Sequence, residues 1–309
     1  MKKNDKIYVA GHAGLVGSAI VRELRQEGYS NIVVRTHSEL DLLDQRAVQS
    51  FFRAEQPQWV FLAAAKVGGI MANCTFPAEF IYNNIMMEAN IIQASYDAAA
   101  AGLLFLGSTC IYPQMAPQPL KEEYLLTGPL EPTNQPYAVA KIAGIEMCRA
   151  FNRQYQTKFT AVMPTNLYGP NDNFDLETSH VLPALIRKFY EAKSRGEDKV
   201  VVWGSGKPVR EFLYVDDLAN ACVFLMQNHI QHDLVNIGTG WGITIRDLAG
   251  MIKDVVGFSG DMVFDLSKPD GTPVKITDTS RLNSLGWKAK TSLAEGLALT
   301  YEWYSNNTK

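Results

Sequence analysis

The chain has 309 residues with 29 basic and 32 acidic side chains, which gives a formal net charge of −3. Because the charges are interspersed and nearly balanced, we expect neither nucleic acid nor an anionic membrane surface as a partner. The N-terminus passes directly into a strand pattern and no long apolar run follows, so we expect no signal peptide, no membrane span and a cytoplasmic protein. The cysteines stand far apart, which predicts neither a disulfide framework nor a metal site: Cys74, Cys110, Cys148 and Cys222.

The first half of the chain alternates short apolar runs with amphipathic stretches. Continuous apolar strands separated by helices are typical of βαβ units, so the pattern predicts a doubly wound α/β fold with a parallel sheet covered on both faces. The predicted strands cover 6–11, 31–36, 59–65, 103–108 and 159–164, and the predicted helices cover 15–28, 44–56, 80–100 and 137–155.

After Pro164 a polar, turn-rich segment precedes further short elements, at 181–196, 199–206, 235–240, 244–257 and 292–304. We interpret them as a smaller substrate domain interwoven with the first. The predicted division is 1–165 plus a return segment at about 211–237 for the nucleotide-binding domain, and 166–210 plus 238–309 for the substrate domain. Two minor features receive structural interpretations: Asp216 or Asp217 caps a helix, and His229 with His232 marks a solvated helix end rather than a metal site.

A glycine pattern follows the first strand. Gly11, Gly14 and Gly17 form G-x-x-G-x-x-G between a strand and a helix, where glycine allows a tight turn and lets backbone N–H groups approach a pyrophosphate. The alternative is a glycine-rich turn without a ligand. The position in a strand-to-helix turn favours a dinucleotide site, whose loop also contains His12, Ala13, Leu15 and Val16.

The residues at the end of the second predicted strand indicate whether NAD or NADP binds. An NAD site usually has a carboxylate there, whereas this chain has Arg35 and His37. Because a guanidinium suits a 2′-phosphate, the sequence favours NADP. Arg35 as a solvated strand-end charge remains the alternative.

Tyr137 and Lys141 lie four residues apart on a predicted helix, so their side chains share one face. A neighbouring ammonium favours the phenolate, and Tyr137 is a plausible proton donor to a carbonyl that is being reduced. Ser108, at the end of the preceding strand, could share the substrate oxygen.

These motifs resemble, in order, the extended short-chain dehydrogenase/reductase superfamily. Its dehydratases carry an Asp-Glu pair where this chain has Thr109 and Cys110, and its simple 4-epimerases carry an acidic residue on the second strand, so neither group fits. The closer resemblance is to the GDP-L-fucose synthase family. Segments that carry it include "AAAKVGGI", "CIYP", "LEPTNQPYAVAKIAGI", "MPTNLYGPNDNF", "VVVWGSGKPVREFLYVDDLA" and "SKPDGTP".

This resemblance implies C3 and C5 epimerisation and NADPH-dependent C4 reduction of GDP-4-keto-6-deoxy-D-mannose. It assigns Cys110 as the base and His180 as the acid of epimerisation, since a thiol and an imidazole can both titrate near neutrality. From position alone, Cys110 could be a small buried residue and His180 a helix cap.

The remaining site residues also follow from the resemblance. A GDP-sugar would contact Lys188, Trp203, Arg210 and Asp270, although Lys188 could be a solvated helix residue and Arg210 an ion partner of Glu211 or Asp216. The implied cofactor contacts are the glycine loop, Arg35, His37, Asp41, Leu42, Leu106, Gly107, Ser108, Lys141, Pro164, Thr165, Asn166, Leu167 and His180.

The apolar faces of the 80–100 and 137–155 helices suggest a homodimer, in which relatives pair such helices; Met86 and Met87 as core residues are the alternative. Two other functions stay open. One is action on a related GDP-4-keto sugar, such as a heptose or colitose precursor. The other is a non-catalytic NADP-binding regulator, which would lack some member of Ser108, Tyr137 and Lys141.

Overall fold

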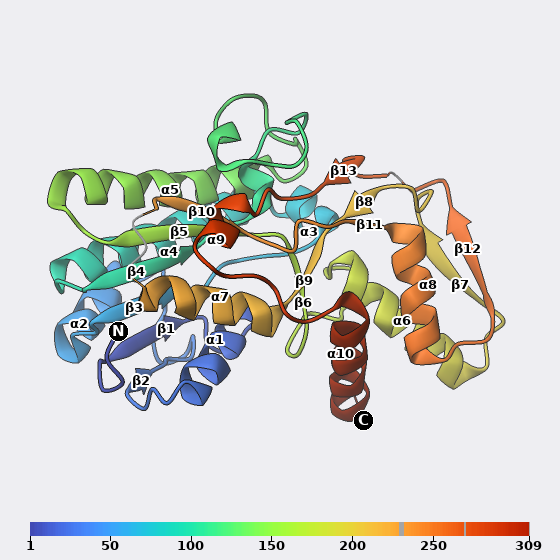
Figure 1. The fold of residues 1–309 in the computed structure, drawn as a ribbon, viewed down its shortest axis with the longest axis horizontal. Helices are drawn as coiled ribbons and strands as arrows, with labels where there is room; N and C mark the ends of the chain where they lie inside the picture. Colours follow the sequence, from blue (N-terminus) through green and yellow to red (C-terminus); the bar gives the residue numbers. More distant parts are fainter. Residues whose placement is uncertain (229–231, 269, 309) are drawn as a thin grey trace.

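The computed structural model describes residues 1–228, 232–268 and 270–308, so His229 lies outside the described residues (Figure 1). Its main element is a six-stranded parallel sheet in the order β2-β1-β3-β4-β5-β10. From β1 the chain first builds β2 on one side and then crosses to β3 on the other, and such a switch point is where α/β sheets bind ligands. The strands are β1 Ile7–Ala10, β2 Ile32–Val33, β3 Trp59–Leu62, β4 Gly102–Leu106, β5 Phe159–Pro164 and β10 Leu234–Ile237.

Alternate residues of the strands enter two cores, as the two-residue period of a strand requires. Ile7 and Val9 pack with α1 (Leu15–Gln26) and α7 (Val215–Gln227), whereas Tyr8 and Ala10 face the opposite core. That second core contains α2 (Gln45–Glu55), α4 (Pro77–Asp97) and α5 (Gln135–Tyr155). The doubly wound α/β prediction is therefore confirmed.

Two of the differences from the expected element bounds concern the second strand and the segment before α4. The second strand pairs only over Ile32–Val33, because the chain turns away to form the bend at Thr36–Glu39. A short helix, α3 (Ile70–Thr75), precedes α4, which begins at Pro77. Proline suits a helix's first turn because it needs no N–H partner there.

The smaller unit lies at the other end of the molecule, around α6, α8, β7 and β12 (Figure 1). Its core also includes α10. Its strands form three small sheets, β11-β8-β13, β12-β7 and β6-β9. The elements are β6 Asn166–Tyr168, α6 Val181–Arg195, β7 Lys199–Trp203, β8 Val209–Arg210, β9 Phe212–Tyr214, β11 Ile243–Thr244, α8 Ile245–Val256, β12 Asp261–Asp265, β13 Val274–Lys275 and α10 Leu293–Asn307.

The chain returns from this unit to the large sheet through α7 and β10. Around α9 (Ser280–Ser284), Leu282 and Trp287 also pack into the core of the large sheet. We propose that the boundary near the C-terminus is interleaved, with 280–289 on the nucleotide-binding unit and α10 on the other.

A helix begins at Val215, but the expectation that Asp216 or Asp217 caps it is wrong. Tyr214 is the N-cap of α7, Asp216 pairs with Arg22, and Asp217 accepts a hydrogen bond from the Thr291 amide at 2.8 Å. Within the described ranges, no helix has the length and apolarity needed to cross a bilayer. The same ranges contain no cluster of three or more His, Cys, Asp or Glu side chains suited to a metal ion.

Candidate active site

The glycine loop has the geometry of a dinucleotide cradle. Gly11 has φ +83°, and a Cβ there would lie 2.7 Å from Ala64 Cα. A Cβ on Gly17 would lie 2.1 Å from the Gly11 carbonyl oxygen, so the helix can approach the turn only with glycine. Gly14 is the N-cap of α1 without a side-chain cap, which leaves backbone N–H groups at the helix start for an anion. The residues present therefore fit the pyrophosphate of a dinucleotide.

Arg35 lies beyond β2, where the 2′-phosphate of NADP would bind. Its side chain is not a free solvated charge. Its Nη2 pairs with Glu55 Oε1 at 2.5 Å, and its guanidinium carbon lies 5.2 Å from the centre of the Phe51 ring. His37 is 84% exposed in its side chain, with Nδ1 3.8 Å from Asp41. Arg35 is therefore held in place by Glu55 and Phe51, whereas His37 is exposed.

Ser108 and Cys110 meet where β4 ends. Ser108 caps the short 3-10 helix η1 (Thr109–Ile111), and the Cys110 thiol donates to Ser108 Oγ at 3.0 Å. Gly107 precedes them, and a Cβ there would lie 2.2 Å from Met163 Cε. The turn therefore brings a hydroxyl and a thiol together at the carboxyl edge of the sheet.

Lys141 is almost wholly buried, at 1% exposure, and its Nζ donates to the Leu106 carbonyl at 2.9 Å. The same ammonium lies 3.0 Å from Glu88 Oε1 on α4 and 5.7 Å from the centre of the Tyr137 ring. Sequence reasoning did not single out Glu88. The available signal was one acidic residue in the otherwise uncharged run "NNIMMEANIIQA".

The charge environment of Tyr137 differs from the expectation that a nearby ammonium favours its phenolate. Burial raises the pKa of Tyr137 well above its ordinary value, and the neighbouring Cys110 and Glu88 raise that pKa further. The ammonium of Lys141 is already paired with Glu88, so it does not offset these effects. Tyr137 is therefore a neutral phenol, the form that can donate a proton.

His180 is the N-cap residue of α6, but its side chain makes no capping hydrogen bond, so the simple cap alternative is not what the structure shows. The loop that precedes His180 contacts the segment after β3. The Gly69 amide donates to the Thr178 carbonyl at 2.9 Å, and a Cβ on Gly69 would lie 2.9 Å from the Ser179 carbonyl oxygen. The loop after β3 thus sets the position of His180.

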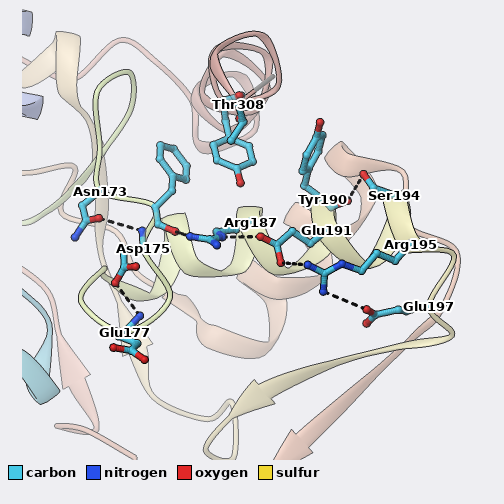
Figure 2. A network of polar contacts seen from close by, with 12 residues as sticks. Asn173, Asp175, Glu177, Arg187, Tyr190, Glu191, Ser194, Arg195, Glu197 and Thr308 are labelled. Atoms are coloured by element: carbon cyan, nitrogen blue, oxygen red, sulfur yellow. Dashed lines mark hydrogen bonds and ion pairs between the residues drawn. The ribbon is translucent and has the colours of Figure 1, made fainter.

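Polar contacts secure the other side of this loop (Figure 2). Asp175 accepts hydrogen bonds from the amides of Glu177 and Thr178, at 3.1 and 3.0 Å. Arg187 on α6 donates to the Phe174 carbonyl at 3.2 Å and pairs with Glu191 at 2.7 Å. The segment that carries His180 is therefore anchored to the helix that it begins.

Lys275 on β13 is a second group that sequence reasoning missed. The His180 side chain reaches solvent, yet the protein around it removes part of its hydration and lowers its pKa, and the Lys275 ammonium lowers that pKa further. Burial also lowers the pKa of Lys275 itself, while Cys110 opposes that shift. Lys275 is thus an electrostatic neighbour of both groups assigned to epimerisation. A lone lysine in "TPVKIT" offered no sequence signal.

The four expected substrate residues lie on the smaller unit as two pairs of neighbours. Lys188 Nζ lies 4.8 Å from the Trp203 ring centre, and Trp203 is 50% exposed. Arg210 interacts electrostatically with Asp270, which accepts a 2.6 Å hydrogen bond from the Ser205 hydroxyl. Among the described ion pairs, none joins Arg210 to Glu211 or Asp216, the two alternative partners. Lys268 was not anticipated and lies 5.2 Å from the Trp203 ring centre.

The segment from Pro164 to Leu167 joins the two units. The Thr165 amide donates to the Ile237 carbonyl at 3.0 Å, and Asn166 Nδ2 donates to the Glu211 carbonyl at 2.8 Å. Leu167 pairs with Leu213 across β6 and β9. The segment therefore lies at the carboxyl edge of β5, as expected.

A doubly wound sheet with a glycine cradle and Ser108, Tyr137 and Lys141 at its carboxyl edge defines the short-chain dehydrogenase/reductase class. Residues 7–238 match the model of the NAD dependent epimerase/dehydratase family, and the chain belongs to this family.

Comparison with individual proteins shows which members of the family this chain resembles. The chain is 58% identical over 305 residues to GDP-L-fucose synthase 1 of Arabidopsis thaliana, covering 99% of this chain and 94% of that protein. A GDP-6-OMe-4-keto-L-xylo-heptose reductase from C. jejuni has a similar structure, with TM-score 0.94, 41% identity and 99% coverage of both chains. A GDP-L-fucose synthetase from Naegleria fowleri bound to NADP has TM-score 0.92 and 33% identity, covering 100% of this chain and 95% of that chain.

Proposed function

We propose that this chain is an NADPH-dependent enzyme that converts GDP-4-keto-6-deoxy-D-mannose to GDP-L-fucose by C3 and C5 epimerisation and C4 reduction. The observation that carries the proposal is the 3.0 Å contact of Cys110 with Ser108 beside a protonated Tyr137. One edge of the sheet thereby offers a thiol for proton abstraction and a phenol for carbonyl reduction. The full-length relationship to GDP-L-fucose synthase 1 supports the same substrate.

Epimerisation uses Cys110 and His180. A C4 ketone acidifies the C–H bonds at C3 and C5, so the Cys110 thiolate can remove a proton and leave an enolate. His180 then delivers a proton to the opposite face of the same carbon. One proton leaves and one returns at each carbon, and no change of oxidation state occurs. Lys275 is an electrostatic neighbour of both groups.

Reduction uses Ser108, Tyr137 and Lys141. NADPH, when bound, supplies a hydride to C4. Ser108 donates a hydrogen bond to the C4 oxygen and orients it, and Tyr137 transfers its phenol proton to that oxygen as the new hydroxyl forms. The glycine loop and the start of α1 bind the pyrophosphate of the cofactor, while Arg35 and His37 face its 2′-phosphate.

The smaller unit binds the GDP moiety. Trp203 offers an exposed ring for stacking on a flat base, and Lys188 lies beside that ring. Arg210 provides a guanidinium fork for a phosphate. These charges explain how a diphosphate can bind a chain whose formal net charge is −3.

A related substrate is the second candidate, because the heptose reductase from C. jejuni shares the whole fold with 41% identity. That protein is named a reductase, whereas in this chain Cys110 lies beside Ser108 and Lys275 interacts with both Cys110 and His180. We therefore place the 6-deoxy hexose first and a GDP-4-keto heptose or colitose precursor second.

We further propose a cytoplasmic homodimer. Cys110 must remain a thiol for the reaction, and all four cysteines are free thiols, which suits a reducing compartment. Apolar side chains on α4 and α5 are exposed, among them Tyr82 at 60% and Tyr155 at 43%. Sedimentation that gives the monomer mass at micromolar concentration would contradict the dimer.

The proposed function is tested by incubating the protein with NADPH and GDP-4-keto-6-deoxy-mannose, following NADPH oxidation and identifying the product by NMR. Wild type should yield GDP-L-fucose. Tyr137→Phe should retain hydrogen exchange at C3 and C5 in deuterated water but reduce C4 about 10²- to 10⁴-fold more slowly. A wild-type protein that oxidises NADPH only with a heptose substrate would favour the second candidate, and one that binds NADPH without oxidising it would favour a regulator.

A further inference from the structure

Glu88 and Lys141 form a buried ion pair next to Tyr137, the proposed proton donor for C4 reduction. Glu88 is 1% exposed, and its Oε1 lies 3.0 Å from Lys141 Nζ. The same Nζ donates to the Leu106 carbonyl at 2.9 Å, at the end of β4. Because an ammonium has three N–H bonds, these two partners leave one N–H for the reaction site.

Glu88 occupies space that the absence of a side chain at Gly144 leaves open, where burial raises its pKa and the Lys141 ammonium opposes that shift. Gly144 on α5 faces it, and a Cβ there would lie 2.8 Å from Glu88 Oε2 and 2.5 Å from Phe105 Cζ. Two buried charges lose their hydration, and well-packed apolar residues of similar volume often give equal or greater stability at such places. Stability alone therefore does not account for an ion pair at this position. The contact of Glu88 with Lys141 instead indicates a role in the reaction.

We propose that Glu88 is a positioning residue for C4 reduction: its carboxylate fixes the Lys141 ammonium against the Leu106 carbonyl and balances the ammonium charge, which keeps the adjacent Tyr137 a neutral proton donor. This role rests on the proposed function, because it concerns the reduction half of that reaction. Epimerisation at Cys110 and His180 does not require it. Glu88 thus supports C4 reduction but is not needed for epimerisation.

The charged and titratable groups around Tyr137 come from three elements: Glu88 from α4, Lys141 from α5 and Cys110 from η1. Glu88 and Cys110 raise the pKa of Tyr137 beyond the effect of burial. A further thiol, Cys148 on α5, also interacts with Glu88, and burial followed by Glu88 raises the pKa of Cys148. Cys148 is therefore an uncharged neighbour, and Glu88 is the carboxylate that opposes Lys141 at Tyr137.

The test compares wild type with Glu88→Gln, Glu88→Asp and a matched control, Glu122→Gln. Glu122 is also a buried carboxylate with a cationic partner, 3.7 Å from Arg281, but it is outside the proposed machinery. For each variant, NADPH oxidation with GDP-4-keto-6-deoxy-mannose gives the pH profile of reduction. Deuterium incorporation at C3 and C5 gives epimerisation separately, and thermal unfolding monitors the fold.

In Glu88→Gln the alkaline fall in reduction should move to lower pH, because a charge that raised the pKa of Tyr137 is gone. Its reduction rate should fall about tenfold or more while deuterium exchange stays at the wild-type rate. Glu88→Asp keeps the charge but withdraws it from Lys141, so the alkaline fall should stay in place while reduction slows severalfold. Glu122→Gln should match wild type in both assays.

A wild-type pH profile in Glu88→Gln, or equal losses of reduction and exchange, would show a purely structural role and overturn the proposal. If Glu88→Gln does not fold, Glu88→Asp decides: unchanged reduction kinetics in that variant overturn positioning. If wild type neither reduces nor exchanges this substrate, the proposed function fails instead. Glu88 is then tested by ultraviolet titration, in which the phenolate signal absent from Tyr137→Phe should appear at lower pH in Glu88→Gln, and an unchanged titration overturns the inference.

Discussion

The Cys110 thiol donates to Ser108 Oγ at 3.0 Å, within one 3-10 turn at the end of β4. The group proposed to deprotonate the sugar is thus in contact with the group proposed to orient its C4 oxygen. A single substrate pose can therefore serve both half-reactions.

Replacing Cys110 by Ser should abolish epimerisation, because an alcohol hydroxyl stays protonated near neutral pH, whereas a thiol can ionise to the thiolate that acts as the base. We expect deuterium exchange at C3 and C5 to fall about 10²- to 10⁴-fold, with NADPH oxidation retained and an unepimerised product. Cys74→Ser, which changes an exposed thiol on α3, is the control. GDP-L-fucose formation by Cys110→Ser at the wild-type rate would assign proton abstraction to another group.

Epimerisation should depend on the protonation of His180. Partial loss of hydration and the Lys275 ammonium lower the pKa of His180, so the imidazolium needed as an acid is lost as pH rises through a midpoint below the ordinary 6.5. Lys275→Met removes one of the two causes, and the midpoint should move upward towards 6.5. The pH dependence of deuterium exchange measures both midpoints.

Lys268→Met is the control for that experiment, since it removes an ammonium next to Trp203 rather than next to His180. An exchange rate that instead rises with pH through the same range would make His180 the base. An unchanged midpoint in Lys275→Met would remove Lys275 from the electrostatics of the site.

Gly17→Ala should weaken NADPH binding by at least about tenfold, because the new Cβ would lie 2.1 Å from the Gly11 carbonyl oxygen and displace either the loop or the start of α1. Gly250→Ala provides a matched control. It adds the same methyl group inside α8 with no atom within 4 Å, and should stabilise the fold by ~0.5–1 kcal/mol without changing affinity. Fluorescence titration with NADPH measures binding, and equal affinities for the two variants would contradict the cradle.

Arg35→Ala should reduce the preference for NADPH over NADH, since the guanidinium fixed by Glu55 is the main cation expected at the 2′-phosphate. The affinity for NADPH should fall about tenfold and that for NADH should change little. Arg53→Ala on the neighbouring helix α2 controls for loss of one positive charge. An unaltered ratio of the two dissociation constants would leave Arg35 a structural partner of Glu55.

The family and the fold were predictable from local patterns. Glycine is needed at Gly11 and Gly17 whatever the rest of the chain does, because the turn and the helix approach are local, and the alternation of apolar runs with helices dictates a parallel sheet. Tyr137 and Lys141 share a helix face for the same reason. Their roles, like those of Cys110 and His180, remain predictions.

Tertiary packing decided the electrostatics. Glu88 and Lys141 are far apart in sequence, and only the packing of α4 on α5 forms their ion pair beside Tyr137. Burial, Cys110 and Glu88 raise the pKa of Tyr137 there, against the expected effect of the ammonium. Lys275 reaches the neighbourhood of Cys110 and His180 through the pairing of β13 with β8. Burial and charge depend on which segments meet in space, so residue type and spacing locate the proton donors but the folded chain sets their protonation.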